Sequence, residues 1–114
     1  HYEAIRRQWR SAWLQKANRE LQARLNLWQE YLAESASDGG RLVDYPFQVR
    51  SRTILDLLIE DGAKLTPALS SLIIELDEQL KIQTCEAPFV WDDDAKSGFP
   101  SGLFWYLYRM QRTI

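Results

Sequence analysis

Residues 2–32 read YEAIRRQWRSAWLQKANRELQARLNLWQEYL, and this stretch decides the fold. It contains neither glycine nor proline, and apolar residues recur in it at intervals of three or four. The recurring residues are Tyr2, Ile5, Trp9, Trp13, Ala17, Leu21, Leu25, Trp28 and Leu32. Such spacing is typical of one face of an α-helix. We therefore predict a helix over residues 3–35, which stops at the small and turn-forming residues Ser35 to Gly40.

The length of this helix carries the main functional indication. It would measure about 45 Å at 1.5 Å per residue, whereas a compact domain of this size is only roughly 35 Å across. Either the protein is elongated, or one end of the helix contacts a partner. We expect the N-terminal third to be the part left uncovered, which would make Trp9 and Trp13 an apolar patch of the kind found at interaction surfaces.

Three shorter helices are predicted over residues 49–61, 66–82 and 100–112. Gly62 stands where a left-handed C-terminal cap is wanted, and Thr66-Pro67 is typical of an N-cap followed by the first helical position. Residues 41–48 are expected to form a linking loop, and residues 83–99 a long irregular one. The prediction is an all-α bundle of one long and three shorter helices in a single domain, residues 1–114.

Composition restricts the class of protein. The 114 residues are 46% hydrophobic and 26% charged with a net charge of −2, which are ordinary globular values. The single cysteine, Cys85, excludes an internal disulfide and favours a reducing compartment, so we expect a cytoplasmic protein. No apolar run approaches the ~18 residues that a membrane span needs.

No catalytic, cofactor-binding or metal-binding residue is predicted. The only histidine is the first residue, and Cys85 is followed by Glu86 rather than by a base or cation that would activate a thiol. Asp92, Asp93 and Asp94 could offer oxygen ligands, but neither register fits a calcium loop of the EF-hand type. We interpret these aspartates as a solvated loop or as a cap of the following helix, and the protein as a non-enzyme.

An aromatic cluster occupies the C-terminal region. Its members are Phe89, Trp91, Phe99, Phe104, Trp105, Tyr106 and Tyr108. Successive residues of a helix point about 100° apart, so Phe104, Trp105 and Tyr106 cannot share one buried face. Two interpretations stay open: the loop over residues 85–99 folds back and covers these rings, or the rings form a surface for a partner or small ligand.

Charge is distributed unevenly along the chain. Six basic and two acidic residues lie within positions 1–24, a net charge of +4, which leaves −6 for the other ninety residues. Arg6, Arg7 and Arg10 beside Trp9 would suit phosphate contact and base stacking. The segment from Ile54 to Thr66 also resembles the opening of some winged-helix and helix-turn-helix regulators. The helix after it carries acidic residues, however, which phosphates would repel.

These features lead to one expected function and two alternatives. We expect a protein–protein interaction or assembly module, a homo-oligomer or a protein that docks its long helix on a partner. The candidate surface comprises Arg6, Trp9, Arg10, Trp13, Trp91, Trp105 and Tyr106. The alternatives are a nucleic-acid binder that uses Arg6, Arg7 and Arg10, and a small-ligand module at the aromatic C-terminal region.

Overall fold

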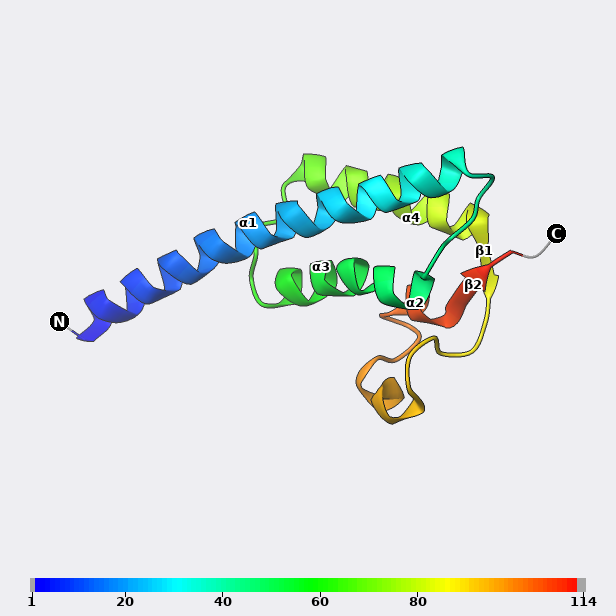
Figure 1. Cartoon of the computed structure of the whole chain (residues 1–114). Helices are drawn as coiled ribbons and strands as arrows, with labels where there is room; N and C mark the ends of the chain where they lie inside the picture. Colours follow the sequence, from blue (N-terminus) through cyan, green and yellow to red (C-terminus); the bar gives the residue numbers. More distant parts are fainter. Residues whose placement is uncertain (1, 113–114) are drawn as a thin grey trace.

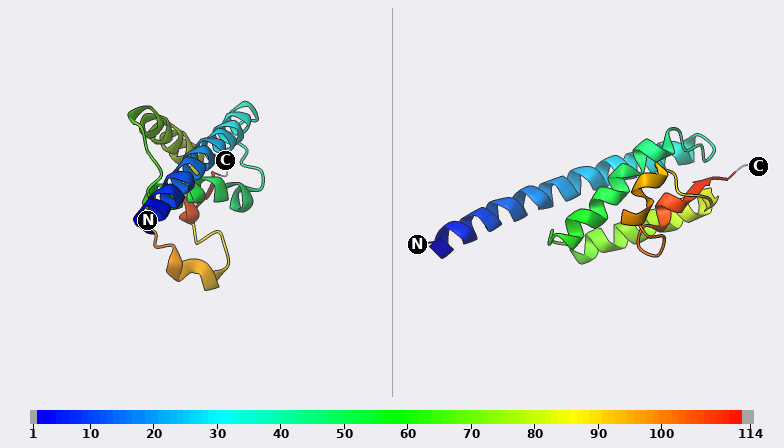
Figure 2. Two further views of the ribbon diagram at one scale, coloured as in Figure 1. Left: turned by 90° about the vertical axis from the view of Figure 1, so that its left-hand side faces the viewer. Right: turned by 90° about the horizontal axis from the view of Figure 1, so that it is seen from below.

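The computed structural model describes residues 2–112, and at Tyr2 the backbone alone. Its helices are α1 (Tyr2–Ser37), α2 (Tyr45–Gln48), α3 (Arg50–Glu60) and α4 (Pro67–Gln83), together with the 3-10 helices η1 (Asp93–Gly98) and η2 (Trp105–Tyr108). Two short strands, β1 (Thr84–Glu86) and β2 (Arg109–Gln111), complete the chain. The described chain is elongated, 62 × 32 × 20 Å. α3 and α4 lie along the C-terminal half of α1, and the N-terminal part of α1 projects beyond them (Figures 1 and 2).

The long helix and α4 begin and end close to the predicted positions. Thr66 caps α4 because its Oγ1 accepts a hydrogen bond from the amide of Leu69 at 3.2 Å. Gly62 has φ +105°, a conformation that favours glycine and that reverses the chain between α3 and α4. These boundaries follow from local chemistry, which explains why the sequence predicted them.

The predicted loop over residues 41–48 is partly wrong, because its last four residues form the helical turn α2. Pro46 stands in the first turn of this helix, where its missing N–H would have no intrahelical acceptor. Asp44 precedes the turn with φ +55° and supplies the change of direction.

The predicted helix over residues 100–112 is wrong. Its place is taken by turns, by η2 and by β2, which pairs with β1 in antiparallel register, Thr84 opposite Gln111 and Glu86 opposite Arg109. This path, which is not one continuous α-helix, lets Phe104, Tyr106 and Leu107 all be buried, which a single helical face would not allow. The fold is therefore mostly helical but not purely all-α, and β1 and η1 also interrupt the segment predicted to be irregular.

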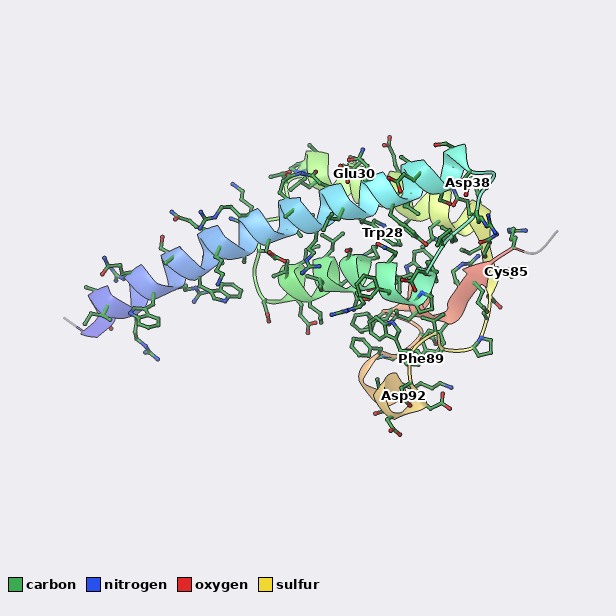
Figure 3. All side chains as sticks on the ribbon, viewed as in Figure 1. Trp28, Glu30, Asp38, Cys85, Phe89 and Asp92 are labelled. Carbon is green, nitrogen blue, oxygen red and sulfur yellow. The ribbon has the colours of Figure 1, made fainter. Side chains whose placement is uncertain are left out.

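The core lies where α1, α3 and α4 meet. From α1 it contains Ala17, Leu21, Leu25, Trp28 and Leu32, each at most 5% exposed. Leu55 of α3 and Leu80 of α4 are fully buried with them. Trp28 lies on the side of α1 that faces α3, and Glu30 on the opposite side (Figure 3). Among the described residues, no helix combines the length and apolar character that would be needed to cross a membrane.

Candidate interaction surface

The N-terminal part of α1 stands outside the body of the protein. We call residues 3–16 the arm and the rest of the described chain the body. Where the two meet, a hydrogen bond 2.8 Å long joins the amide of Lys64, in the α3–α4 connection, to Oδ1 of Asn18. Within the arm every side chain is exposed except that of Leu14, which is half-buried. The arm is therefore a helix that the body leaves largely uncovered.

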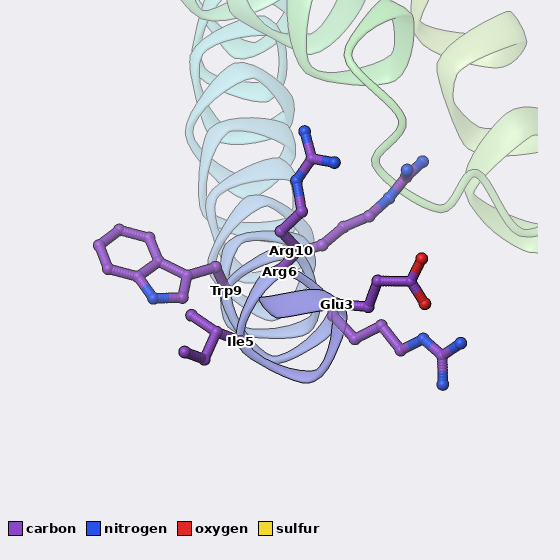
Figure 4. Close-up of a pocket in the computed structure, with 6 residues that line it drawn as sticks. Glu3, Ile5, Arg6, Trp9 and Arg10 are labelled. Atoms are coloured by element: carbon purple, nitrogen blue, oxygen red, sulfur yellow. The ribbon is translucent and has the colours of Figure 1, made fainter. Parts of the chain in front are cut away.

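Large apolar side chains of the arm face solvent. Trp9 is 76% exposed, Ile5 45% and Trp13 43%, whereas Trp28 in the same helix is 1% exposed. Ile5 and Trp9 project from one side of the helix and Glu3 from the other (Figure 4). Trp9 and Trp13 also border a shallow hollow with Gln8, Ala12 and Lys16. The structure thus brings together two of the predicted tryptophans on one exposed face.

The arm is uncovered because its apolar stripe turns around the helix. A step of four residues advances a side chain by about 40° around the axis, since 3.6 residues make one turn. Ile5, Trp9, Trp13 and Ala17 are separated by three such steps in succession, so the stripe reaches the core side only at Ala17. This angular drift of the stripe can be read from the sequence, because the apolar residues from Ile5 to Ala17 are spaced by four without a step of three. Counting apolar positions without their angles around the helix does not show it.

Arginine occupies the core-facing side of α1 once the helix enters the arm. Arg6 and Arg10 lie in line with the buried residues Leu21 and Trp28, within about 60° around the axis. Both arginines are exposed. A longer α3 or α4 would therefore meet charge rather than apolar surface, which explains why the body ends where it does. Figure 4 shows the arginine side chains directed away from Ile5 and Trp9.

The C-terminal aromatic residues are largely covered by their own loop. Trp91 donates a hydrogen bond from Nε1 to the carbonyl of Pro46 at 2.7 Å. Its ring contacts Phe99, which contacts Phe104, at centroid distances of 5.2 and 5.0 Å. Tyr106 is fully buried, while Trp91 and Trp105 are half-buried. The loop over residues 85–99 thus folds back on the cluster, and the segment of the chain that carries these three candidate residues lies away from the arm (Figure 1).

Tyr106 belongs to a polar network that joins the C-terminal segment to the helices. Its hydroxyl donates to Oδ2 of Asp56 at 2.7 Å, and its carbonyl accepts a hydrogen bond from the Tyr45 hydroxyl. Burial, followed by the hydrogen bond to Asp56, raises the pKa of Tyr106 well above its ordinary value. Arg52, 5% exposed, donates two 2.9 Å hydrogen bonds to Asp77 and lies over the Tyr106 ring. Sequence reasoning missed this network because its members come from four elements, α2, α3, α4 and η2.

The aspartate cluster caps a local turn. Oδ1 of Asp92 accepts a hydrogen bond from the amide of Asp94 at 3.3 Å, which makes Asp92 the N-cap of η1. No group of three His, Cys, Asp or Glu side chains in residues 2–112 is arranged to hold a metal ion. Cys85 is exposed on β1 (Figure 3).

The chain matches no protein-family model, no curated protein and no solved structure.

Proposed function

We propose that the protein is an assembly module that self-associates through the arm of α1. The observation that carries this proposal is the exposure of Ile5, Trp9 and Trp13 on a helix that projects outside the body. Contiguous exposed apolar side chains mark interaction surfaces, and tryptophan and arginine are the residue types enriched at the energetic centres of protein interfaces.

Charge supports association between copies of the chain. Residues 1–16 contain four basic residues and one acidic residue, a net charge of +3, which leaves −5 for residues 17–114. Complementary potentials speed the encounter of two proteins and orient them. Because the arm is basic and the body is acidic, the arm of one copy can pair electrostatically with the body of another copy. A different protein is not required as the partner.

Size-exclusion chromatography coupled to light scattering tests the proposal. We expect a mass that rises with protein concentration from one chain towards two or more, and weaker association at higher salt. The double variant Trp9→Ala/Trp13→Ala should remain a monomer at concentrations where the unchanged protein associates. Phe47→Ala/Leu103→Ala is the matched control, because Phe47 and Leu103 are exposed apolar residues of the body. An unchanged protein that stays monomeric at the highest concentration refutes the proposal.

Nucleic-acid binding is a second candidate, favoured by the exposure of Trp9 near Arg6 and Arg10. Stacking of bases on tryptophan and contact of arginine with phosphates would give an affinity that falls steeply with salt. Fluorescence anisotropy with labelled single-stranded DNA and RNA at low salt measures it. Replacing Arg6, Arg7 and Arg10 with Gln should abolish binding, and absence of binding by the unchanged protein excludes this candidate.

A further inference from the structure

A second line of side chains runs along nearly the whole length of α1, on a side that the body leaves open. We call it the outer face, and it comprises Ile5, Trp9, Ala12, Lys16, Glu20, Ala23, Leu27, Glu30 and Glu34. These residues follow one another at intervals of three or four that average close to one helical turn, so the line stays nearly straight. All are exposed except Glu20, which is half-buried. The half of the outer face that belongs to the body, its body half, runs from Glu20 to Glu34. Its large apolar residue is Leu27, which is 52% exposed.

The two halves of the outer face are complementary in charge. Its arm half contains Ile5, Trp9 and the cation Lys16, whereas its body half contains Leu27 and the carboxylates of Glu30 and Glu34. Two such faces laid parallel would set like charges together. Laid antiparallel, they set the basic half of each helix against the acidic half of the other.

We propose that a second copy of this chain occupies the outer face, its α1 running antiparallel about a two-fold axis at the level of Asn18. In this register Trp9 lies level with Leu27 of the second copy, Trp13 with Ala23, and Lys16 with Glu20. The inference rests on the proposed self-association and assigns to it a surface, an orientation and a register. Because the contact is isologous, each of these pairings occurs twice, which is the commonest arrangement in soluble oligomers.

The position of the body on α1 fits the same axis. The elements that pack on α1 begin near Asn18, where Lys64 donates its hydrogen bond, and continue from there towards Ser37. About an antiparallel axis at Asn18 the two bodies lie at opposite ends of the helix pair and do not compete for space. Each arm then lies along residues 20–33 of the other α1. The arm is therefore as long as the stretch that it covers in this pairing.

The competing docking surface for the arm of a second copy is the exposed side of α4, where Ile74 and Ile82 are 59% and 73% exposed. Glu78 lies between them, one turn from each. Docking of the arm there would be head-to-tail and would leave Leu27 uncovered. Charge reversal and cross-linking separate the two arrangements.

Charge reversal at the level of the axis tests the register. Within one chain Glu20 already pairs with Nε of Arg24 at 2.7 Å, and in this register Lys16 of the second copy joins that pair. Lys16→Glu sets a carboxylate against Glu20 at both pairings of the homodimer, and Glu20→Lys sets a cation against Lys16 at both. Each variant alone should dissociate roughly five- to tenfold more readily than the unchanged protein, since two partly exposed ion pairs become repulsive. An equimolar mixture of the two variants should restore association, because the heterodimer regains opposite charges at both pairings. Light scattering measures all three samples, and circular dichroism confirms that each variant remains helical.

A cysteine placed near the axis gives an independent readout. In a Cys85→Ser background, Arg19→Cys should form a disulfide-linked dimer under mild oxidation, whereas Leu27→Cys should not, because its two copies would lie about 27 Å apart along the axis. Glu78→Lys is the control for docking on α4 and should leave association unchanged.

The outcomes distinguish the two proposals. Association that is abolished by Trp9→Ala/Trp13→Ala but insensitive to charge at Lys16 and Glu20 overturns the antiparallel register and leaves self-association standing. Loss of association in Glu78→Lys instead assigns the contact to α4. A protein that is monomeric in every sample overturns both the register and the proposed function.

Discussion

The two halves of α1 both carry large apolar side chains at helical intervals, but only the second half buries most of them. Trp28 in the second half is 1% exposed and stacks on Tyr31 with ring centroids 5.7 Å apart, whereas Trp9 in the first half is 76% exposed. The halves differ in the direction of the apolar stripe, which turns away from the core in the arm while arginine takes its place. Apolar periodicity therefore predicts that a helix forms, but the angular drift of the stripe decides which part of it a body can cover.

Arginine provides the strongest contrast between body and arm. Replacing Arg52 with Ala should lower the free energy of unfolding by about 3 to 5 kcal/mol, because Asp77 and Asp56 would be left without their buried partner. Arg10→Ala, in the exposed arm, should change it by less than about 0.5 kcal/mol. Urea denaturation at low protein concentration measures both. Equal effects at the two positions would contradict the division into arm and body.

Two leucines of the same helix offer a closer comparison. Leu25 is fully buried and Leu27 is 52% exposed, although they are only two residues apart. Leu25→Ala should destabilise the protein by about 2 to 5 kcal/mol through loss of core contacts and the cavity left behind. Leu27→Ala should cost less than about 0.5 kcal/mol in the monomer yet weaken self-association. Thermal unfolding monitored by circular dichroism, paired with light scattering, separates the two effects.

The buried tyrosine of the body predicts a dependence on alkaline pH. Burial and the hydrogen bond to Asp56 raise the pKa of Tyr106 above its unfolded value of 10.0. The stabilisation that Tyr106 contributes is therefore complete below pH 10 and is lost as the pH rises from there towards the folded pKa. Tyr106→Phe should cost about 1.5 to 3 kcal/mol at pH 7 through its missing hydrogen bond to a carboxylate.

The same variant should show a smaller loss of stability above pH 10 than the unchanged protein does. Urea denaturation at a series of pH values measures this difference. Identical alkaline slopes for the two proteins would mean that Tyr106 does not contribute to the titration.

The smallest effect on stability is expected in the arm. Trp9→Ala should change the free energy of unfolding of the monomer by less than about 0.5 kcal/mol, because the side chain has little buried area to lose. Urea denaturation followed by circular dichroism, which reports on the helices rather than on any one tryptophan, measures the change. A large destabilisation would show that the body covers the arm in the monomer.

Local chemistry made much of the fold predictable. The helical periods of α1, α3 and α4, the Thr66-Pro67 start signal and the Gly62 turn all depend on residues close together in sequence. β2 was not predictable in this way, because its pairing joins Thr84 to Gln111 across 26 intervening positions, and Arg109 is held by Oγ1 of Thr84 at 2.7 Å. A three-residue strand has too little pattern of its own to reveal such a partner.

The exposure of the candidate residues was predictable in part. Trp9 and Trp13 were selected from the length of the helix, but the sequence placed Trp91, Trp105 and Tyr106 on equal terms with them. Only the folded loop distinguishes these groups, since it buries Tyr106 and half-covers the other two. Burial depends on what packs above a residue, and that information is not local.

By itself, the sequence determined that the first third of the chain forms one helix, that α4 starts after Thr66, and that the arm is basic while the remainder is acidic. These properties follow from spacing, capping and residue type, which act over a few positions of the chain. The tertiary structure decided where the body ends on α1, that the last segment pairs as a strand rather than forming a helix, and which aromatic rings meet solvent. Those outcomes depend on contacts between segments distant in sequence, because a side chain is buried only when another part of the fold covers it.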